Sequence, residues 1–300
     1  MTTLLQVSNL TKTYGDEKTV DDISFELNRH TSTALIGPNG AGKTTILSML
    51  AGLITPSNGA ITIEKSTTKD IRSIIGFLPQ YPKFFPWLTA LEFTEMAARL
   101  SGVETKRVTL EAKKTLEFVG LGDAMKKKTG TLSGGMKQRL GLAQAVVHKP
   151  KLLLLDEPVS ALDPVGRRQV MDLLKELQQE VTILYSTHIL NDAEEMTDQL
   201  LFLRQGKLVE KGSLDDVRMR YAEPRIIIKF EEKQELQRFI KVSPWKVTSI
   251  GATATIDVLL EGAEMPVVLS MLTTGSFAVS KVERQMASLE EIFMKVAVDS

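Results

Sequence analysis

The pattern of apolar and polar residues along the first half of the chain predicts β-strands that alternate with α-helices. Residues 33–36 and 181–185 are short apolar segments with β-branched side chains, which is typical of buried strands. Residues 44–53 have the apolar spacing of a helix, and Pro56 follows as a terminator. Such an alternation is typical of an α/β sheet.

A longer helix is predicted for residues 163–180. Asp163 is placed to cap its N-terminus, and Pro164 occupies the first helical position, where proline is tolerated. The apolar side of this helix consists of Val170, Leu173, Leu174 and Leu177. The helix leads directly into the predicted strand at 181–185, so it extends the α/β pattern.

Two further groups of elements are expected around the sheet. Antiparallel strands are predicted at residues 4–10, 20–27 and 60–63. Residues from 84 to about 150 are mostly helical in pattern, with helices at 90–100 and 110–119. The expected fold is therefore an α/β core sheet with an antiparallel β flank and a helical insertion.

The composition changes after Tyr221, and residues 221–300 predict a second, smaller α/β domain of about 80 residues. Its expected strands are residues 225–230, 247–250, 254–260 and 277–282, with a hairpin across Gly251. Its expected helices are residues 233–240, 267–272 and 289–296. In the last helix Leu289, Ile292, Phe293 and Val296 have helical spacing, which favours packing within this domain over a ligand-binding, regulatory role.

The composition agrees with a folded chain of two domains, 1–220 and 221–300. Hydrophobic residues make up 43% of the 300 residues and charged residues 25%, as in ordinary globular proteins. Basic and acidic residues number 37 each, and this neutrality argues against a nucleic-acid partner. The absence of cysteine excludes disulfides, zinc ribbons, iron–sulfur ligation and thiol catalysis.

The sequence predicts neither a signal peptide nor a membrane span. The first basic residue is Lys12, and no charged segment leads an apolar one near the N-terminus. No apolar run approaches the roughly 18 residues that cross a bilayer. We therefore expect a cytoplasmic chain, for which a separate protein supplies any membrane part.

The segment Gly37-Pro38-Asn39-Gly40-Ala41-Gly42-Lys43-Thr44 has the GxxxxGK[ST] pattern of a phosphate-binding loop. Its glycines let backbone N–H groups point inward, and the helix that follows adds the positive end of its dipole. Lys43 can reach the β- and γ-phosphates, and the Thr44 hydroxyl can ligate Mg²⁺. The motif lies between a predicted strand and a predicted helix, which favours this interpretation over a chance glycine-rich turn.

Two carboxylates, Asp156 and Glu157, end the apolar strand predicted at residues 152–155. Buried carboxylates are costly unless they are compensated, and Mg²⁺ would compensate Asp156. Glu157 is then placed to orient or deprotonate a water. A strand end with a helix-capping acid explains the same two residues without a metal.

His188 follows the strand predicted at 181–185, and a lone histidine is more often structural than functional. However, the phosphate loop, Asp156 and His188 all lie at the carboxyl ends of predicted strands, where open parallel sheets bind ligands. This coincidence predicts a nucleoside-triphosphate hydrolase. A second glycine-rich helix start, at Leu132-Ser133-Gly134-Gly135-Met136, offers another anion-binding end, although a simple capped helix explains it too.

Together these motifs resemble the ATP-binding subunit of ABC transporters. The features that match in order are the phosphate loop through Thr45, Gln80, residues 132–136, Asp156-Glu157, residues 160–163 and His188. The resemblance covers residues 4–215 and implies a P-loop NTPase fold. Met136 departs from the glutamine that the family most often has, while the Ser-Gly-Gly core is intact.

The resemblance implies ATP and Mg²⁺ as ligands and a head-to-tail dimer that encloses two ATP molecules. Ser133, Gly134 and Gly135 of one subunit would then contact the γ-phosphate that the other subunit's Lys43 holds. Glu157 would be the catalytic base and His188 would hold the γ-phosphate. The remaining roles implied are Mg²⁺ and water contact for Gln80, communication across the dimer for Asp163, and adenine stacking for Tyr14. An edge-strand tyrosine is an equally simple explanation of Tyr14.

The resemblance further implies a motor subunit that drives a separate membrane permease from the cytoplasmic face. Residues 288–293 resemble the tails of drug- and peptide-export ATPases, so export is the expected direction. The aromatic residues 81–87 would meet the permease, or else pack the helical insertion onto the sheet. The dimer partner is a second copy or a paralogue. The alternative function is a soluble ABC ATPase, against which the single set of motifs and the lack of a long heptad repeat argue.

Overall fold

The computed structural model describes residues 2–64, 73–160, 162–221 and 223–298, without the side chains of 260 and 296–298. Ala161, within the predicted 160–163 motif, and the side chain of Val296 therefore lie outside the described residues. The chain divides into two compact units, Met1–Leu214 and Asp215–Asp299. Within the described part, no helix is long and apolar enough to cross a membrane.

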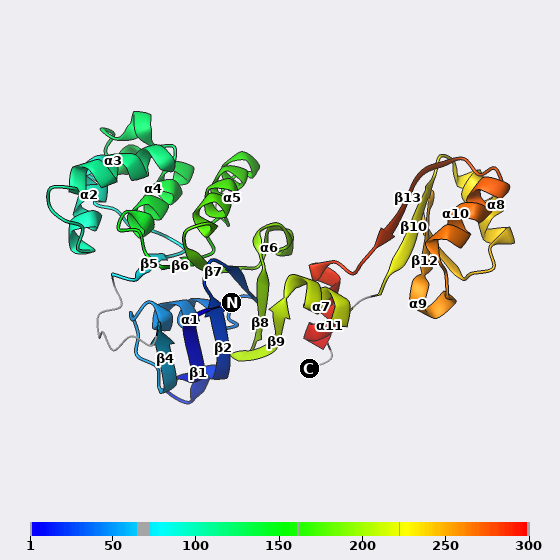
Figure 1. Cartoon of the computed structure of the whole chain (residues 1–300), viewed down its shortest axis with the longest axis horizontal. Coiled ribbons are helices and arrows are strands. Elements are labelled where there is room, and N and C mark those ends of the chain that lie inside the picture. The colour runs from blue at the N-terminus through cyan, green and yellow to red at the C-terminus, as the bar shows by residue number, and fades with distance from the viewer. Residues whose placement is uncertain (1, 65–72, 161, 222, 299–300) are drawn as a thin grey trace. The chain divides into compact units, whose positions relative to one another are not determined.

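The first unit is built on a six-stranded sheet (Figure 1). Its strands follow the order β5 (Ile75–Leu78), β6 (Leu152–Asp156), β7 (Thr182–Thr187), β3 (Ser32–Ile36), β8 (Gln199–Arg204) and β9 (Lys207–Ser213). The first five strands are parallel, and β9 pairs antiparallel with β8. Every residue of β3, β6 and β7 is buried, which explains why the sequence shows them as apolar runs rather than alternating patterns.

The predicted antiparallel flank is present as a sheet of β2 (Glu17–Asn28), β1 (Thr3–Tyr14) and β4 (Asn58–Ile63). Helix α1 (Lys43–Leu50) contributes to one hydrophobic core together with both sheets. The helix begins one residue before the predicted start and ends at Leu50 rather than residue 53. Gly52 adopts a φ of +70°, a left-handed conformation that does not continue a helix.

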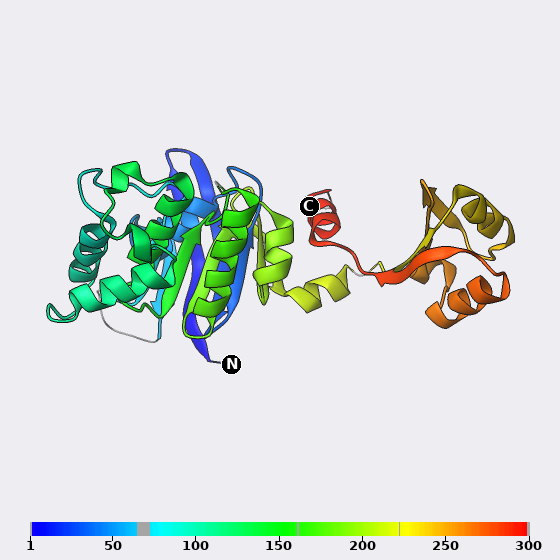
Figure 2. The same ribbon diagram turned by 90° about the horizontal axis from the view of Figure 1, so that it is seen from above.

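Helices α2 (Ala90–Leu100), α3 (Val108–Phe118) and α4 (Gly134–Val146) form the predicted helical insertion. Figures 1 and 2 show them gathered at one end of the first unit. Helix α2 begins with a capping box, in which Thr89 and Glu92 satisfy each other's backbone N–H groups. Helices α5 (Pro164–Gln178) and α6 (Leu190–Met196) precede and follow β7.

The second unit contains an antiparallel sheet in the order β11 (Val247–Ile250), β12 (Thr253–Asp257), β10 (Arg225–Phe230) and β13 (Val279–Gln285). Its helices are α7 (Leu214–Arg220), α8 (Lys233–Val242), α9 (Val258–Glu261), α10 (Met265–Thr274) and α11 (Leu289–Val298). Alternate residues of β10, namely Ile226, Ile228 and Phe230, form one core with α8 and α10. In the final helix, Leu289 and Ile292 are buried.

The structure corrects two predicted strands in this unit. The strand expected at 254–260 ends at Asp257, because its carboxylate accepts a hydrogen bond from the Leu259 N–H and starts α9 instead. The strand expected at 277–282 begins at Val279, since Phe277 packs edge-on against Phe230 and Phe239. The sequence reasoning also missed β5, β8, β9, α6 and α7.

The buried strand β6 offers a test of the core. Replacing Leu154, which is completely buried, by alanine should lower the free energy of unfolding by about 2–5 kcal/mol, because it removes apolar contacts and leaves a cavity. The matched control is Leu53→Ala, where the leucine is 63% exposed and the expected change is within about 0.5 kcal/mol. Urea unfolding followed by circular dichroism measures both. Equal effects would contradict the assignment of β6 to the core.

Candidate functional site

Three strands end at the same edge of the six-stranded sheet. Ile36 of β3 lies opposite Thr187 of β7, and Asp156 of β6 lies opposite Ser186. The phosphate loop, the two carboxylates and His188 therefore leave the sheet side by side, as expected from the predicted strand ends. This is the edge at which open parallel sheets bind ligands.

The glycine-rich segment that joins β3 to α1 is packed tightly against neighbouring backbone. A Cβ on Gly37 would lie 2.3 Å from the Leu203 carbonyl oxygen, and a Cβ on Gly42 would lie 2.6 Å from that of Thr19. Gly40 and Gly42 also adopt left-handed φ values of +81° and +100°. The loop conformation thus depends on both steric space and backbone freedom, which only glycine supplies here.

Lys43 is folded back over this loop and is 6% exposed. Its Nζ donates to the carbonyl oxygens of Gly37 at 2.7 Å and Pro38 at 3.1 Å. Burial lowers the pKa of Lys43, while the nearby Glu157 and Asp156 carboxylates oppose that shift. Charged oxygens bind an ammonium more strongly than carbonyls do, so an anion in the loop would compete well for this side chain.

The buried carboxylate of Asp156 joins the helix start to the sheet. Its Oδ2 accepts a hydrogen bond from the Thr44 hydroxyl at 2.8 Å, and its Oδ1 accepts one from the Ser186 hydroxyl at 2.6 Å. Ser186 Oγ in turn accepts the backbone N–H of Glu157 at 2.9 Å. Sequence reasoning missed Ser186; the available signal was a polar residue inside an apolar strand, two positions before His188.

Glu157 lies between two other predicted site residues. Gln80 Nε2 donates to its Oε2 at 3.0 Å, and His188 Nδ1 lies 3.0 Å from its Oε1. The backbone of Glu157 has a φ of +48°, which is uncommon for a residue other than glycine and costs about 1–3 kcal/mol. The structure therefore aims this carboxylate at Gln80 and His188 beside the phosphate loop, at some cost in strain.

The oxygen atoms around Asp156 suit a magnesium ion. Mg²⁺ prefers oxygen ligands and is usually held by one or two protein groups together with substrate phosphates. The Thr44 hydroxyl and the Asp156 carboxylate are adjacent oxygen donors at the phosphate loop. No group of three His, Cys, Asp or Glu residues that could hold a metal exists among the described residues, so water and phosphate oxygens would supply the remaining ligands.

The other predicted site residues are not part of this cluster. Ser133 caps α4 by accepting the Met136 N–H at 3.3 Å, and Asp163 caps α5 by accepting the Gly166 N–H at 2.7 Å. Ser133, Gly134, Asp163 and Tyr14 are exposed. Buried Gln138, which the sequence did not single out, ties α4 to the loop after Glu157 by donating to the Pro158 carbonyl at 2.8 Å. Within one chain, Ser133 and Asp163 therefore lie at the surface, apart from the cluster beside the phosphate loop.

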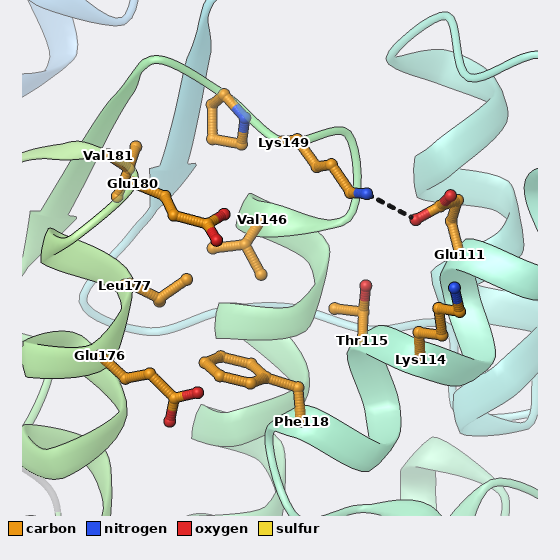
Figure 3. A pocket seen from close by; sticks show the side chains of 11 residues that line it. Glu111, Lys114, Thr115, Phe118, Val146, Lys149, Glu176, Leu177, Glu180 and Val181 are labelled. Atoms are coloured by element: carbon orange, nitrogen blue, oxygen red, sulfur yellow. Dashed lines mark ion pairs between the residues drawn. The ribbon is translucent and has the colours of Figure 1, made fainter.

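A separate pocket lies among α3, α4 and α5 (Figure 3). Phe118, Val146 and Leu177 give it an apolar wall, and the ion pair between Lys149 and Glu111, 3.2 Å long, crosses one side. None of the predicted site residues lines this pocket. The chemistry described above therefore belongs to the sheet edge rather than to this cavity.

Comparison with known proteins decides the family. Residues 20–160 match the ABC transporter family, and residues 212–297 match the C-terminal domain of DrrA1-3-like ATP-binding proteins. The chain is 40% identical over 296 residues to the uncharacterized ABC transporter ATP-binding protein YxlF of Bacillus subtilis (strain 168), covering 98% of this chain and 99% of that protein. The chain belongs to the ABC transporter ATP-binding proteins.

Two further ABC proteins extend the comparison. The bacitracin transport ATP-binding protein BcrA of Bacillus licheniformis is 33% identical over 305 residues, covering 99% of this chain and 98% of BcrA. A dimeric ATP-binding cassette in a post-hydrolysis state, bound to ADP and Pi, is similar with a TM-score of 0.65 and 27% identity, covering 70% of this chain and 99% of that one. The predicted function is confirmed: this ABC protein is an ATP-hydrolysing transport subunit, and the soluble alternative is not supported.

The role of Ser186 gives a test of the site. Ser186→Ala removes one hydrogen bond from the Asp156 carboxylate and leaves the buried Glu157 N–H unpaired, which costs about 1–3 kcal/mol. We expect the misplaced Asp156 and Glu157 carboxylates to raise the activation free energy of ATP hydrolysis by about 1.4 kcal/mol, which lowers kcat roughly tenfold. Steady-state ATPase assays measure this. The control is Ser280→Ala, an exposed hydroxyl of β13 in the second unit; an equal loss there would contradict a local effect.

Proposed function

We propose that the chain hydrolyses ATP as half of a head-to-tail dimer and drives export through a separate membrane permease. The observation that supports this most directly is the placement of the Glu157 carboxylate between Gln80 and His188, beside a phosphate loop. A carboxylate in that position can take a proton from a water that Gln80 helps to orient. We therefore assign proton transfer to Glu157 and orientation of the attacking water to Gln80.

The phosphate loop would hold the triphosphate before the chemical step. Backbone N–H groups of residues 39–45 and the Lys43 ammonium would bind the β- and γ-phosphates, with Lys43 exchanging its two carbonyl partners for phosphate oxygens. His188 is half-exposed and already oriented by Glu157, so its other ring nitrogen is available to hold the γ-phosphate. Tyr14, which is exposed at the end of β1, would stack on adenine.

Mg²⁺ would be held by Thr44 and Asp156, with Gln80 nearby, and when bound it supplies charge stabilisation for the phosphates. The protein side of this arrangement is the pair of hydrogen bonds that fixes the Asp156 carboxylate between Thr44 and Ser186. Those bonds place the donor oxygens without any contribution from a partner subunit.

A second subunit would complete each site. Ser133, Gly134 and Gly135 lie at the start of α4, where backbone N–H groups have no partner within the helix, and Asp163 is exposed at the start of α5. Such a helix start binds anions, which suits contact with the γ-phosphate held by the opposite subunit. The similarity to a dimeric cassette supports this arrangement. The partner would be a second copy or a paralogue.

Exposed aromatic residues after Gln80 would contact the permease at the cytoplasmic face of the membrane. Phe85 is 46% and Trp87 65% exposed, and their rings touch at 5.3 Å between centroids. Phe84, in contrast, packs edge-on against Phe93 of α2, which is a contact within the helical insertion. The relative named for bacitracin transport and the DrrA1-3-like C-terminal domain support export as the direction.

The base assignment is tested by Glu157→Gln. The amide keeps the size of the side chain but cannot accept the proton, so kcat should fall by about 10²–10⁴ while ATP affinity is retained. Single-turnover hydrolysis and equilibrium binding of a fluorescent ATP analogue measure the two effects separately. Hydrolysis at the wild-type rate would show that Glu157 is not the base.

The permease surface is tested by the double variant Phe85→Ala/Trp87→Ala. Loss of this exposed aromatic pair should abolish stimulation of ATP hydrolysis by the membrane subunit, while the chain alone keeps its basal rate. The control is Leu100→Ala, which removes another exposed apolar side chain, 80% accessible, from α2. Co-purification with the permease and vesicle transport assays measure coupling. Unchanged coupling in the double variant would place the interface elsewhere.

A further inference from the structure

Helices α5 and α6 both begin beside predicted site residues. Asp163 caps α5, and the backbone N–H of Arg167 donates to the Asp163 carbonyl one turn later. His188 stands two residues before α6, and Asp192 lies one turn further along the chain. A contact between Arg167 and Asp192 therefore connects the first turn after Asp163 with the first turn after His188.

That contact is open, and the Arg167 side chain that makes it is 33% exposed. Arg167 Nε and Asp192 Oδ2 are 3.8 Å apart, which is too long for a hydrogen bond. Both atoms are buried and have no hydrogen-bond partner within the described part of the chain. Asp192 is only 7% exposed, and burial raises the pKa of its carboxyl group, while the Arg167 guanidinium opposes that shift. Charged groups buried at this distance gain from a small movement that brings them into hydrogen-bonding contact.

Helix α6 has few other devices to fix its start. Ile189 occupies its N-cap position and provides no side-chain hydrogen bond, and the helix is only seven residues long. Glu195 of α6 pairs with Lys175 of α5 at 2.9 Å and also with Arg168, and this cluster is exposed. The closed Glu195 cluster serves as an internal control for the open Arg167–Asp192 pair.

We propose that Arg167 and Asp192 are positioning residues that couple closure of the dimer to the placement of His188. Contact of Asp163 with the partner subunit would shift the first turn of α5 and close the pair. Asp192 would then fix the start of α6, and with it His188, so that the existing contact of His188 with Glu157 is kept while the γ-phosphate is bound. This inference rests on the head-to-tail dimer of the proposed function.

The test is a double-mutant cycle on the full chain. Asp192→Asn and Arg167→Gln should each lower kcat for ATP hydrolysis about tenfold, within the range usual for coupling between sites. ATP affinity should change by less than about twofold, because neither side chain is placed at the nucleotide. The double variant should lose no more than either single variant, since each removes the same interaction.

Two sets of controls separate coupling from general damage. Glu195→Gln opens the exposed cluster between the same helices and should leave kcat within about twofold. Asp192→Glu keeps the carboxylate and lengthens the side chain across the 3.8 Å gap. Unlike Asp192→Asn, this variant should therefore keep most of the wild-type kcat. A structural defect would instead reduce the amount of chain that binds ATP, which equilibrium binding and thermal unfolding of each variant detect.

The outcomes distinguish this inference from the proposed function. Wild-type kcat in Asp192→Asn, losses that multiply in the double variant, or an equal loss in Glu195→Gln would overturn the coupling. Sedimentation of the Glu157→Gln variant with ATP tests the dimer itself. A monomer in that experiment would contradict both the proposed dimer and the coupling. A dimer combined with wild-type kcat in Asp192→Asn would contradict the coupling alone.

Discussion

The buried Asp156 carboxylate is the interaction on which the site depends. A charge at this depth is tolerated only if strong partners surround it, and Thr44 and Ser186 each give it a hydroxyl. These partners come from α1 and β7, so one carboxylate joins three elements that are far apart in the sequence. Because Ser186 also accepts the Glu157 N–H, the same network sets the left-handed backbone that aims the Glu157 side chain.

The phosphate loop is supported from the opposite side by backbone atoms. Leu203 of β8 and Thr19 of β2 approach Gly37 and Gly42 so closely that no side chain fits at either position. The antiparallel flank and strand β8 of the main sheet therefore support the shape of the site through their backbone atoms. This packing explains why a loop with so few side-chain contacts has a defined shape before any ligand binds.

The proposed catalytic residues form one cluster within the chain, whereas other proposed site residues lie at the surface and need a partner subunit. Within one subunit, Asp156 bonds to Thr44 beside Lys43, and Glu157 contacts His188, while Ser133 and Asp163 cap helices at the surface. Such a division suits a motor, because hydrolysis can then respond to whether the second subunit is docked. The Arg167–Asp192 pair would transmit that docking from Asp163, which precedes α5 in the sequence, to His188, which follows β7.

The sequence by itself determined the phosphate loop, the carboxylates after β6 and the strand ends that bring them together. Those features are local: glycine spacing, a run of leucines and a proline after Asp163 are visible in a few residues. Strands β5, β8 and β9 and the short helices α6 and α7 escaped prediction, because they are short and their stability comes from neighbouring strands and helices. Only the tertiary structure decided that Ser186 holds Asp156, that Gln80 meets Glu157 across 77 positions, and that Arg167 faces Asp192, since these contacts depend on strand register and helix packing rather than on any local pattern.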